Sequence, residues 1–142
     1  MKKILLLIAV FTILAFAGRA QCNGDVNFIS SKSQMVNQKG EVLGSKDGTT
    51  VIEITKKSVS LTFNGDEKTT LAGEIKEEKC EWGEPFKNGK SIIKAVLEDA
   101  GGDVKHVTLT IEAKDGKITI TGDAEERPNE RIKFDVDKYE LK

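Results

Sequence analysis

Apolar and polar residues alternate with a period of two from about Thr49 onward, and this pattern constrains the fold more than any other feature. In residues 104–113, for example, Val107, Leu109 and Ile111 are separated by polar residues. Successive side chains of a β-strand point to opposite faces of the sheet, so the alternation gives each strand one apolar face. The chain is therefore predicted to be all-β.

Short turn motifs separate these strands. Asn64-Gly65 and Asp115-Gly116 are predicted to form two-residue hairpin turns, because both dipeptides tolerate the positive φ angles that such turns need. Residues 99–103 are predicted to form another reversal, and a longer polar loop contains Pro128. Consecutive strands joined in this way form an antiparallel up-and-down meander.

The region from residue 23 to residue 46 alternates less clearly. Val26 and Phe28 suggest a first strand, and residues 35–36 and 42–43 suggest two more short strands. Asp47-Gly48 is predicted to be a turn. The order of the strands in this region stays open.

A single apolar face on about eight strands must close on itself or stack on a second sheet. The prediction is one all-β domain, residues 21–142, that forms a small barrel or a flattened barrel or sandwich. This outline resembles a lipocalin-type or calycin-like barrel, and is similar in general character to the small secreted β-proteins of bacteria. It departs from the early Gly-x-Trp signature of lipocalins, because Trp82 lies mid-chain and precedes Gly83. The resemblance implies a barrel whose interior can hold a small apolar ligand.

Residues 1–20 are predicted to be a secretory signal peptide. Two lysines precede the apolar run of residues 4–17, and Gly18 and Ala20 supply the small residues of a cleavage site after Ala20. The run is shorter than the ~20 residues of a membrane-spanning helix. We therefore expect a secreted or periplasmic protein with no transmembrane segment after cleavage.

The mature chain contains two cysteines, Cys22 and Cys80, and export would place both in an oxidising compartment. We expect them to form a disulfide that ties the mature N-terminus to the domain. Redox or zinc chemistry is the alternative, but the chain has no Cys-x-x-Cys motif, and its single histidine cannot complete a zinc site with two cysteines.

The charge of the chain argues against nucleic acids and anionic lipids as partners. The whole chain has 22 basic and 23 acidic residues, and cleavage removes three basic residues and no acidic one. The mature protein is thus acidic, whereas nucleic acids and anionic lipids require clusters of Lys and Arg. No nucleic-acid partner is expected.

No residue pattern indicates catalysis. His106 shares the polar face of its strand with Thr108 and is expected to face solvent, without a catalytic partner. Asp135 and Asp137 share one face of the last expected strand and could form half of a calcium site, but a solvated face explains them better. We expect no catalytic residue, metal or cofactor, and no enzyme activity.

Residues 81–89 lack alternation and are predicted to be the longest internal connection. Trp82, Pro85 and Phe86 in this segment are the candidate binding residues, because an aromatic loop can line a pocket or anchor a partner. In the alternative, Trp82 caps the core.

The predicted function is that of an exported, non-enzymatic binding protein. In the first possibility, a small apolar molecule or lipid occupies the barrel. In the second, the interior is solid, and the outer surface or the Trp82 segment docks a secreted or envelope protein, as an inhibitor does.

Overall fold

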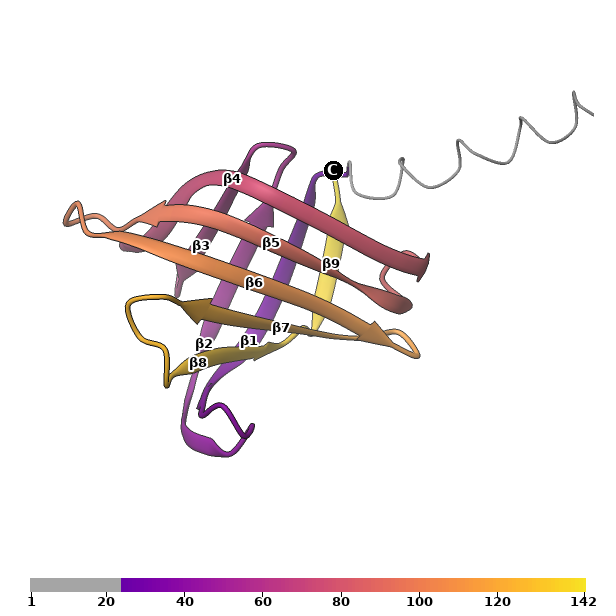
Figure 1. The fold of residues 1–142 in the computed structure, drawn as a ribbon, viewed down its shortest axis with the longest axis horizontal. Helices are drawn as coiled ribbons and strands as arrows, with labels where there is room; N and C mark the ends of the chain where they lie inside the picture. Colours follow the sequence, from indigo (N-terminus) through magenta and orange to yellow (C-terminus); the bar gives the residue numbers. More distant parts are fainter. Residues whose placement is uncertain (1–23) are drawn as a thin grey trace, which may run out of the picture.

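The computed structural model describes residues 24–142, and this part of the chain forms nine β-strands and no helix (Figure 1). The strands are β1 (Val26–Val36), β2 (Val42–Ile54), β3 (Ser58–Phe63), β4 (Asp66–Glu84), β5 (Asn88–Glu98), β6 (Val104–Lys114), β7 (Lys117–Ala124), β8 (Arg131–Asp135) and β9 (Lys138–Leu141).

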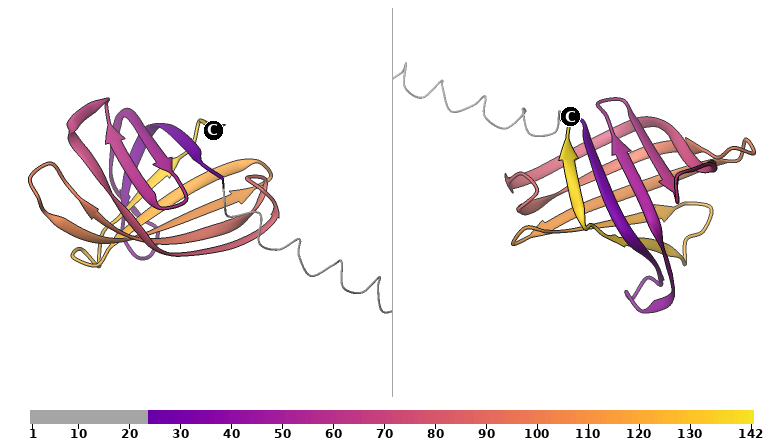
Figure 2. Two further views of the ribbon diagram at one scale, coloured as in Figure 1. Left: turned by 90° about the horizontal axis from the view of Figure 1, so that it is seen from above. Right: turned by 180° about the vertical axis from the view of Figure 1, so that it is seen from behind.

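Strands β1 to β8 close into an antiparallel barrel (Figures 1 and 2). Each strand pairs with the next in the chain, and β8 returns to pair with residues 33–36 of β1. The additional strand β9 pairs with residues 26–29 of the same edge of β1. The prediction of an all-β up-and-down fold is confirmed, in its closed-barrel form, and an eight-stranded barrel is compatible with the lipocalin-like architecture that the sequence resembles.

The inward face of the alternating pattern fills the centre of the barrel. Its largest fully buried apolar side chains come from β1, β2, β3, β5, β6, β7 and β8: Phe28, Ile52, Val59, Ile93, Leu97, Leu109, Ile120 and Phe134. A barrel of eight strands is just wide enough for side chains to fill it. The centre is therefore a solid core, and space for a ligand occurs at the two ends.

The predicted hairpin turns are confirmed. Asn64 and Gly65 have φ angles of 52° and 67°, and Asp115 and Gly116 have φ angles of 52° and 80°. Two consecutive positive φ angles match the right-handed twist of the flanking strands, as in a type I′ turn.

The predicted turn at Asp47-Gly48 is wrong, because both residues lie inside β2. Residues 35–36 and 42–43 are the ends of the long strands β1 and β2, joined by residues 37–41. The pairing of these strands shifts register opposite Ser30–Lys32, and Gly48 there has a φ of 145°. The glycine thus accommodates a bulge that bends the strand, instead of reversing the chain.

The predicted long connection at residues 81–89 is also wrong. Strand β4 continues to Glu84 and β5 begins at Asn88, so the link is only residues 85–87. The β4–β5 register shifts between Ile75 and Glu77, and the more buried positions change there from odd-numbered to even-numbered residues. This bulge hides the strand from a simple count of alternation.

The last expected strand, on which Asp135 and Asp137 were predicted to share one face, is broken into β8 and β9. The backbone N–H of Asp137 donates to Ile29 O at 2.8 Å, and its Oδ2 accepts from the backbone N–H of Ser31 at 2.6 Å. The buried Ser30 hydroxyl donates to Asp135 O at 2.8 Å. These bonds replace regular pairing at residues 29–31 of β1, opposite the bulge of β2, and let the chain change direction.

The predictions for residues 1–23 lie outside the described residues. They include the signal peptide, cleavage after Ala20 and the pairing of Cys22 with Cys80, which all stay predictions. Cys80 itself is half-buried on β4, with its Sγ 3.3 Å from Ser91 Oγ. No helix of the length and hydropathy needed to cross a membrane occurs among the described residues.

Candidate functional site

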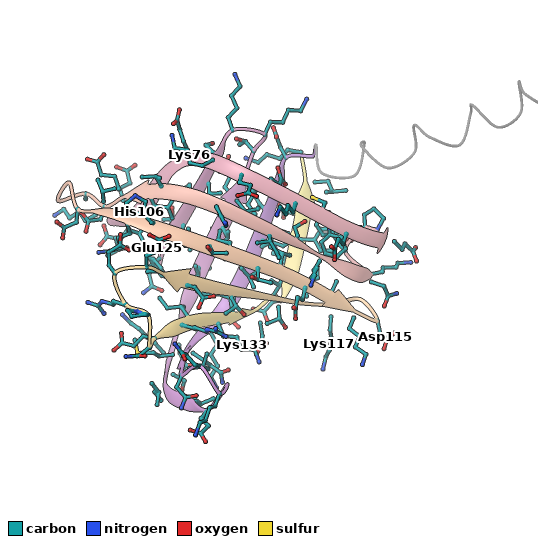
Figure 3. All side chains as sticks on the ribbon, in the orientation of Figure 1. Lys76, His106, Asp115, Lys117, Glu125 and Lys133 are labelled. Atoms are coloured by element: carbon teal, nitrogen blue, oxygen red, sulfur yellow. The ribbon has the colours of Figure 1, made fainter. Side chains whose placement is uncertain are left out.

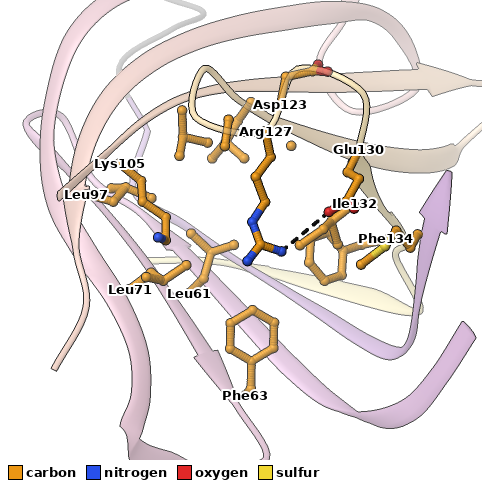
Figure 4. A pocket seen from close by; sticks show the side chains of 15 residues that line it. Leu61, Phe63, Leu71, Leu97, Lys105, Asp123, Arg127, Glu130, Ile132 and Phe134 are labelled. Carbon is orange, nitrogen blue, oxygen red and sulfur yellow. Dashed lines mark hydrogen bonds and ion pairs between the residues drawn. The ribbon is translucent and has the colours of Figure 1, made fainter. Parts of the chain in front are cut away.

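A cavity of about 260 Å³ lies at one end of the barrel, which we call the open end (Figure 4). Small inward residues of β7, Gly122 and Ala124, contribute to its lining in place of the large residues that fill the centre. Its wall is mostly apolar and includes Leu61, Phe63, Leu71, Leu97, Val107, Leu109, Ile132 and Phe134. An apolar wall of this kind suits an apolar part of a small molecule.

Four charged side chains line the same cavity: Lys105, Asp123, Arg127 and Glu130. Lys105 lies two residues before Val107 on β6 and so shares its inward face. Arg127 belongs to the loop of residues 125–130 between β7 and β8. Figure 4 shows both cationic side chains extending into the opening.

The acidic groups at the open end each have a cationic partner. Asp123 Oδ1 is 2.6 Å from Arg131 Nε, and Glu130 Oε2 is 3.4 Å from Arg127 Nη1. Within residues 24–142, the ammonium group of Lys105 has no hydrogen bond or ion pair. The open end therefore presents one uncompensated positive charge beside an apolar wall.

The loop that carries Arg127 is fixed from two sides. The N–H of Glu125 donates to His106 O at 3.0 Å, and the N–H of His106 donates to Glu126 Oε1 at 3.0 Å. On the other side, Gln38 Nε2 donates to Pro128 O at 2.8 Å. These bonds hold the rim of the cavity in place.

His106 faces outward, as predicted (Figure 3). Its Nδ1 is 2.9 Å from Glu126 Oε1. The hydrogen bond to Glu126 raises the pKa of His106, and the hydrogen bonds from His106 lower the pKa of Glu126 to about 2. The pair connects β6 to the loop and lies outside the cavity.

The opposite end of the barrel, which we call the aromatic end, contains the three candidate residues from the sequence. Trp82, Pro85 and Phe86 together line a hollow of about 270 Å³. The ring of Phe86 packs in tilted geometry against those of Trp82 and Tyr139, with centroid distances of 5.4 and 5.1 Å. The indole Nε1–H of Trp82 donates to Ser91 Oγ at 2.8 Å.

The aromatic end also packs on the core. Trp82 and Phe86 are partly buried against it, and the ring of Phe86 lies 5.6 Å from that of the buried Phe28. Glu78 lines the same hollow, and burial raises the pKa of its carboxyl group. The contacts place Trp82 and Phe86 as a cap over this end of the barrel.

The outer surface of the barrel carries many charged side chains. Lys76, Lys117 and Lys133 project outward from the barrel (Figure 3). Asp135 lies 4.0 Å from Lys133 Nζ, and Asp137 accepts the N–H of Ser31. In the described part of the chain, no group of three or more His, Cys, Asp or Glu residues is placed to hold a metal ion.

Sequence reasoning missed the open end. Lys105 has the same parity as Val107, Leu109 and Ile111, so counting one step further along the strand would have placed it inward. Arg127 gives no such signal, because it lies in a loop without periodicity.

Comparison of the chain with protein families, with curated proteins and with solved structures finds no match.

Proposed function

We propose that the protein is an exported, non-enzymatic binding protein that holds a small apolar molecule in the open end of its barrel. The cavity of about 260 Å³ with its apolar wall carries this proposal. The apolar run of residues 4–17, with its flanking lysines and small residues, supports export to the periplasm or the cell exterior.

The size of the cavity limits the ligand. At ~30 Å³ for each water-sized unit, the cavity of about 260 Å³ accommodates a molecule of about nine non-hydrogen atoms. The fully buried Leu109 and Phe134 line its inner wall, so the ligand enters from the rim. At about 0.5 kcal/mol per atom, a ligand of this size would bind with a Kd of about 0.5 mM.

A second candidate function is docking of a secreted or envelope protein. The β1–β2 hairpin projects beyond the barrel (Figure 1), and Val42 and Leu43 near its tip are 56% and 58% exposed. In the described chain, β2 pairs with β3 only from Thr50 to Ile54, which leaves the outer edge of residues 42–48 open. An extended segment of a partner can add to such an edge.

Titration with octan-1-ol, an uncharged chain of suitable size, tests the first candidate. We expect saturable chemical-shift changes in the NMR spectrum at millimolar ligand. The variant Ala124→Phe fills the cavity and should abolish them, because Ala124 lines the space that the chain would occupy. Ala72→Phe, on the exposed outer face of β4, is the matched control and should bind normally.

The folded state of each variant is checked by circular dichroism and thermal unfolding. Absence of saturable binding to the unmodified protein would contradict the proposal and favour the second candidate. Equal binding by a folded Ala124→Phe variant would place the ligand elsewhere.

A further inference from the structure

The charge at the rim of the cavity narrows the chemistry of the ligand, and this inference rests on the proposed function. We infer that the bound molecule is a short-chain monocarboxylate, whose chain lies against the apolar wall and whose carboxylate pairs with Lys105. The ligand class is thus an amphiphile with one negative charge.

The first argument is the balance of charge. Arg127 is paired with Glu130 and Arg131 is paired with Asp123, at 3.4 and 2.6 Å. Within residues 24–142, Lys105 has no acidic side chain as an ion-pair partner. A ligand with one negative charge would neutralise the site, whereas a dianion would leave an excess negative charge near Asp123 and Glu130.

The second argument is the position of Lys105. Its side chain is only partly exposed and lines the cavity together with Leu71, Leu97 and Val107. Figure 4 shows the side chain of Lys105 among the apolar side chains of the cavity, near Leu71 and Leu97. A charge in such surroundings gains more from an opposite charge than a solvated surface lysine does.

Lys105 differs from several lysines on the outer surface of the molecule. The chain has more acidic than basic residues, and lysines on its outer surface such as Lys76 and Lys94 are paired with glutamates at 2.6 and 3.4 Å. The general charge of the protein would repel an anion. Binding of one therefore requires a local cation, and the inward face of β6 supplies it.

A pair of ligands that differ only in the head group tests the inference. Octanoate and octan-1-ol are titrated separately at pH 7, where octanoate is ionised, and binding is followed by NMR. We expect the unmodified protein to bind octanoate about tenfold more tightly than octan-1-ol.

Lys105→Met should remove this preference, because the charge that pairs with the carboxylate is gone while the apolar residues of the wall stay. Lys105→Arg keeps the charge and should retain the preference. Lys94→Met is the matched control, since it removes an exposed lysine from the outer face of neighbouring β5, and it should also retain the preference.

The outcomes separate the two proposals. Binding of octan-1-ol without preference for octanoate would overturn the inference and leave the proposed function standing. Binding of neither ligand would overturn the proposed function itself. A preference that persists in the Lys105→Met variant would overturn the role of Lys105.

Discussion

The contact between His106 and Glu126 connects a strand to the loop that carries Arg127. The hydrogen bond between them lowers the pKa of Glu126 from 4.5 to about 2 and raises the pKa of His106 above 6.5. The lowered pKa of Glu126 stabilises the fold above pH 4.5, and this contribution disappears as the pH falls towards 2. The raised pKa of His106 stabilises the fold below pH 6.5, and this contribution disappears as the pH rises through the raised pKa. The pair therefore contributes most between pH 4.5 and 6.5.

Replacement of Glu126 by Gln should return the pKa of His106 towards 6.5, because the carboxylate that favours the protonated imidazole is gone. The chain has one histidine, so NMR titration of its ring protons is unambiguous. Glu125→Gln is the control. It should change the pKa of His106 less, since the charge of Glu125 makes the smallest of the contributions that raise this pKa. An unchanged pKa in the Glu126→Gln variant would show that the contact is absent in solution.

For single residues, the sequence predicts whether a strand side chain points into or out of the barrel better than it predicts which residues that side chain contacts. Parity along a strand is enough to place the side chain of His106 outside and that of Leu109 inside, and both predictions are confirmed. Parity also places Lys105 inside. The position of Arg127 and its contact with Glu130 cannot be predicted from the alternation of apolar and polar residues. Both depend on how the loop between β7 and β8 is folded.

The turn between β4 and β5 breaks a local rule. The N–H of Lys87 donates to Glu84 O at 3.0 Å, and Phe86 has a φ of 59° between these residues. Glycine or asparagine usually occupies such a position, and another residue costs about 1–3 kcal/mol. The packing of Phe86 on Phe28, Trp82 and Tyr139 compensates for this cost.

Two substitutions at Phe86 separate these effects. Phe86→Ala removes the ring and keeps the strain, whereas Phe86→Gly removes both. We expect both variants to be less stable than the original, and the glycine variant to be more stable than the alanine variant by about 1 kcal/mol.

Urea unfolding measures the two free energies of unfolding. The matched controls are Ile92→Ala and Ile92→Gly, on the outer face of β5. At an ordinary strand position the glycine variant should be less stable than the alanine variant. The same order at Phe86 as at Ile92 would contradict a positive φ at Phe86.

At the element scale, strands with regular alternation and two-residue turns are predictable, and interrupted strands are not. The turns at 64–65 and 115–116 follow from dipeptides whose φ angles are restricted. The bulges near Gly48 and Lys76 each insert one residue and reverse the parity of the rest of the strand. The sequence therefore led to a turn at Asp47-Gly48 and a loop at Trp82, where the structure has continuous strands.

At the scale of the whole molecule, closure follows from the count of strands with one apolar face. Such strands hide that face only by curling or stacking, and eight of them close around one layer of packed side chains. The location of the cavity was not predictable in this way. It depends on Gly122 and Ala124 meeting the ends of several other strands that are distant in the sequence.

We propose that a small molecule binds at the open end of the barrel and not at the aromatic end. Intermolecular nuclear Overhauser effects from the chain of bound octan-1-ol measure its position directly. We expect contacts with the methyl groups of Leu61, Leu97 and Leu109, which line the cavity. Contacts with the rings of Trp82 and Phe86 instead, or saturable binding without contacts to those leucines, would contradict it.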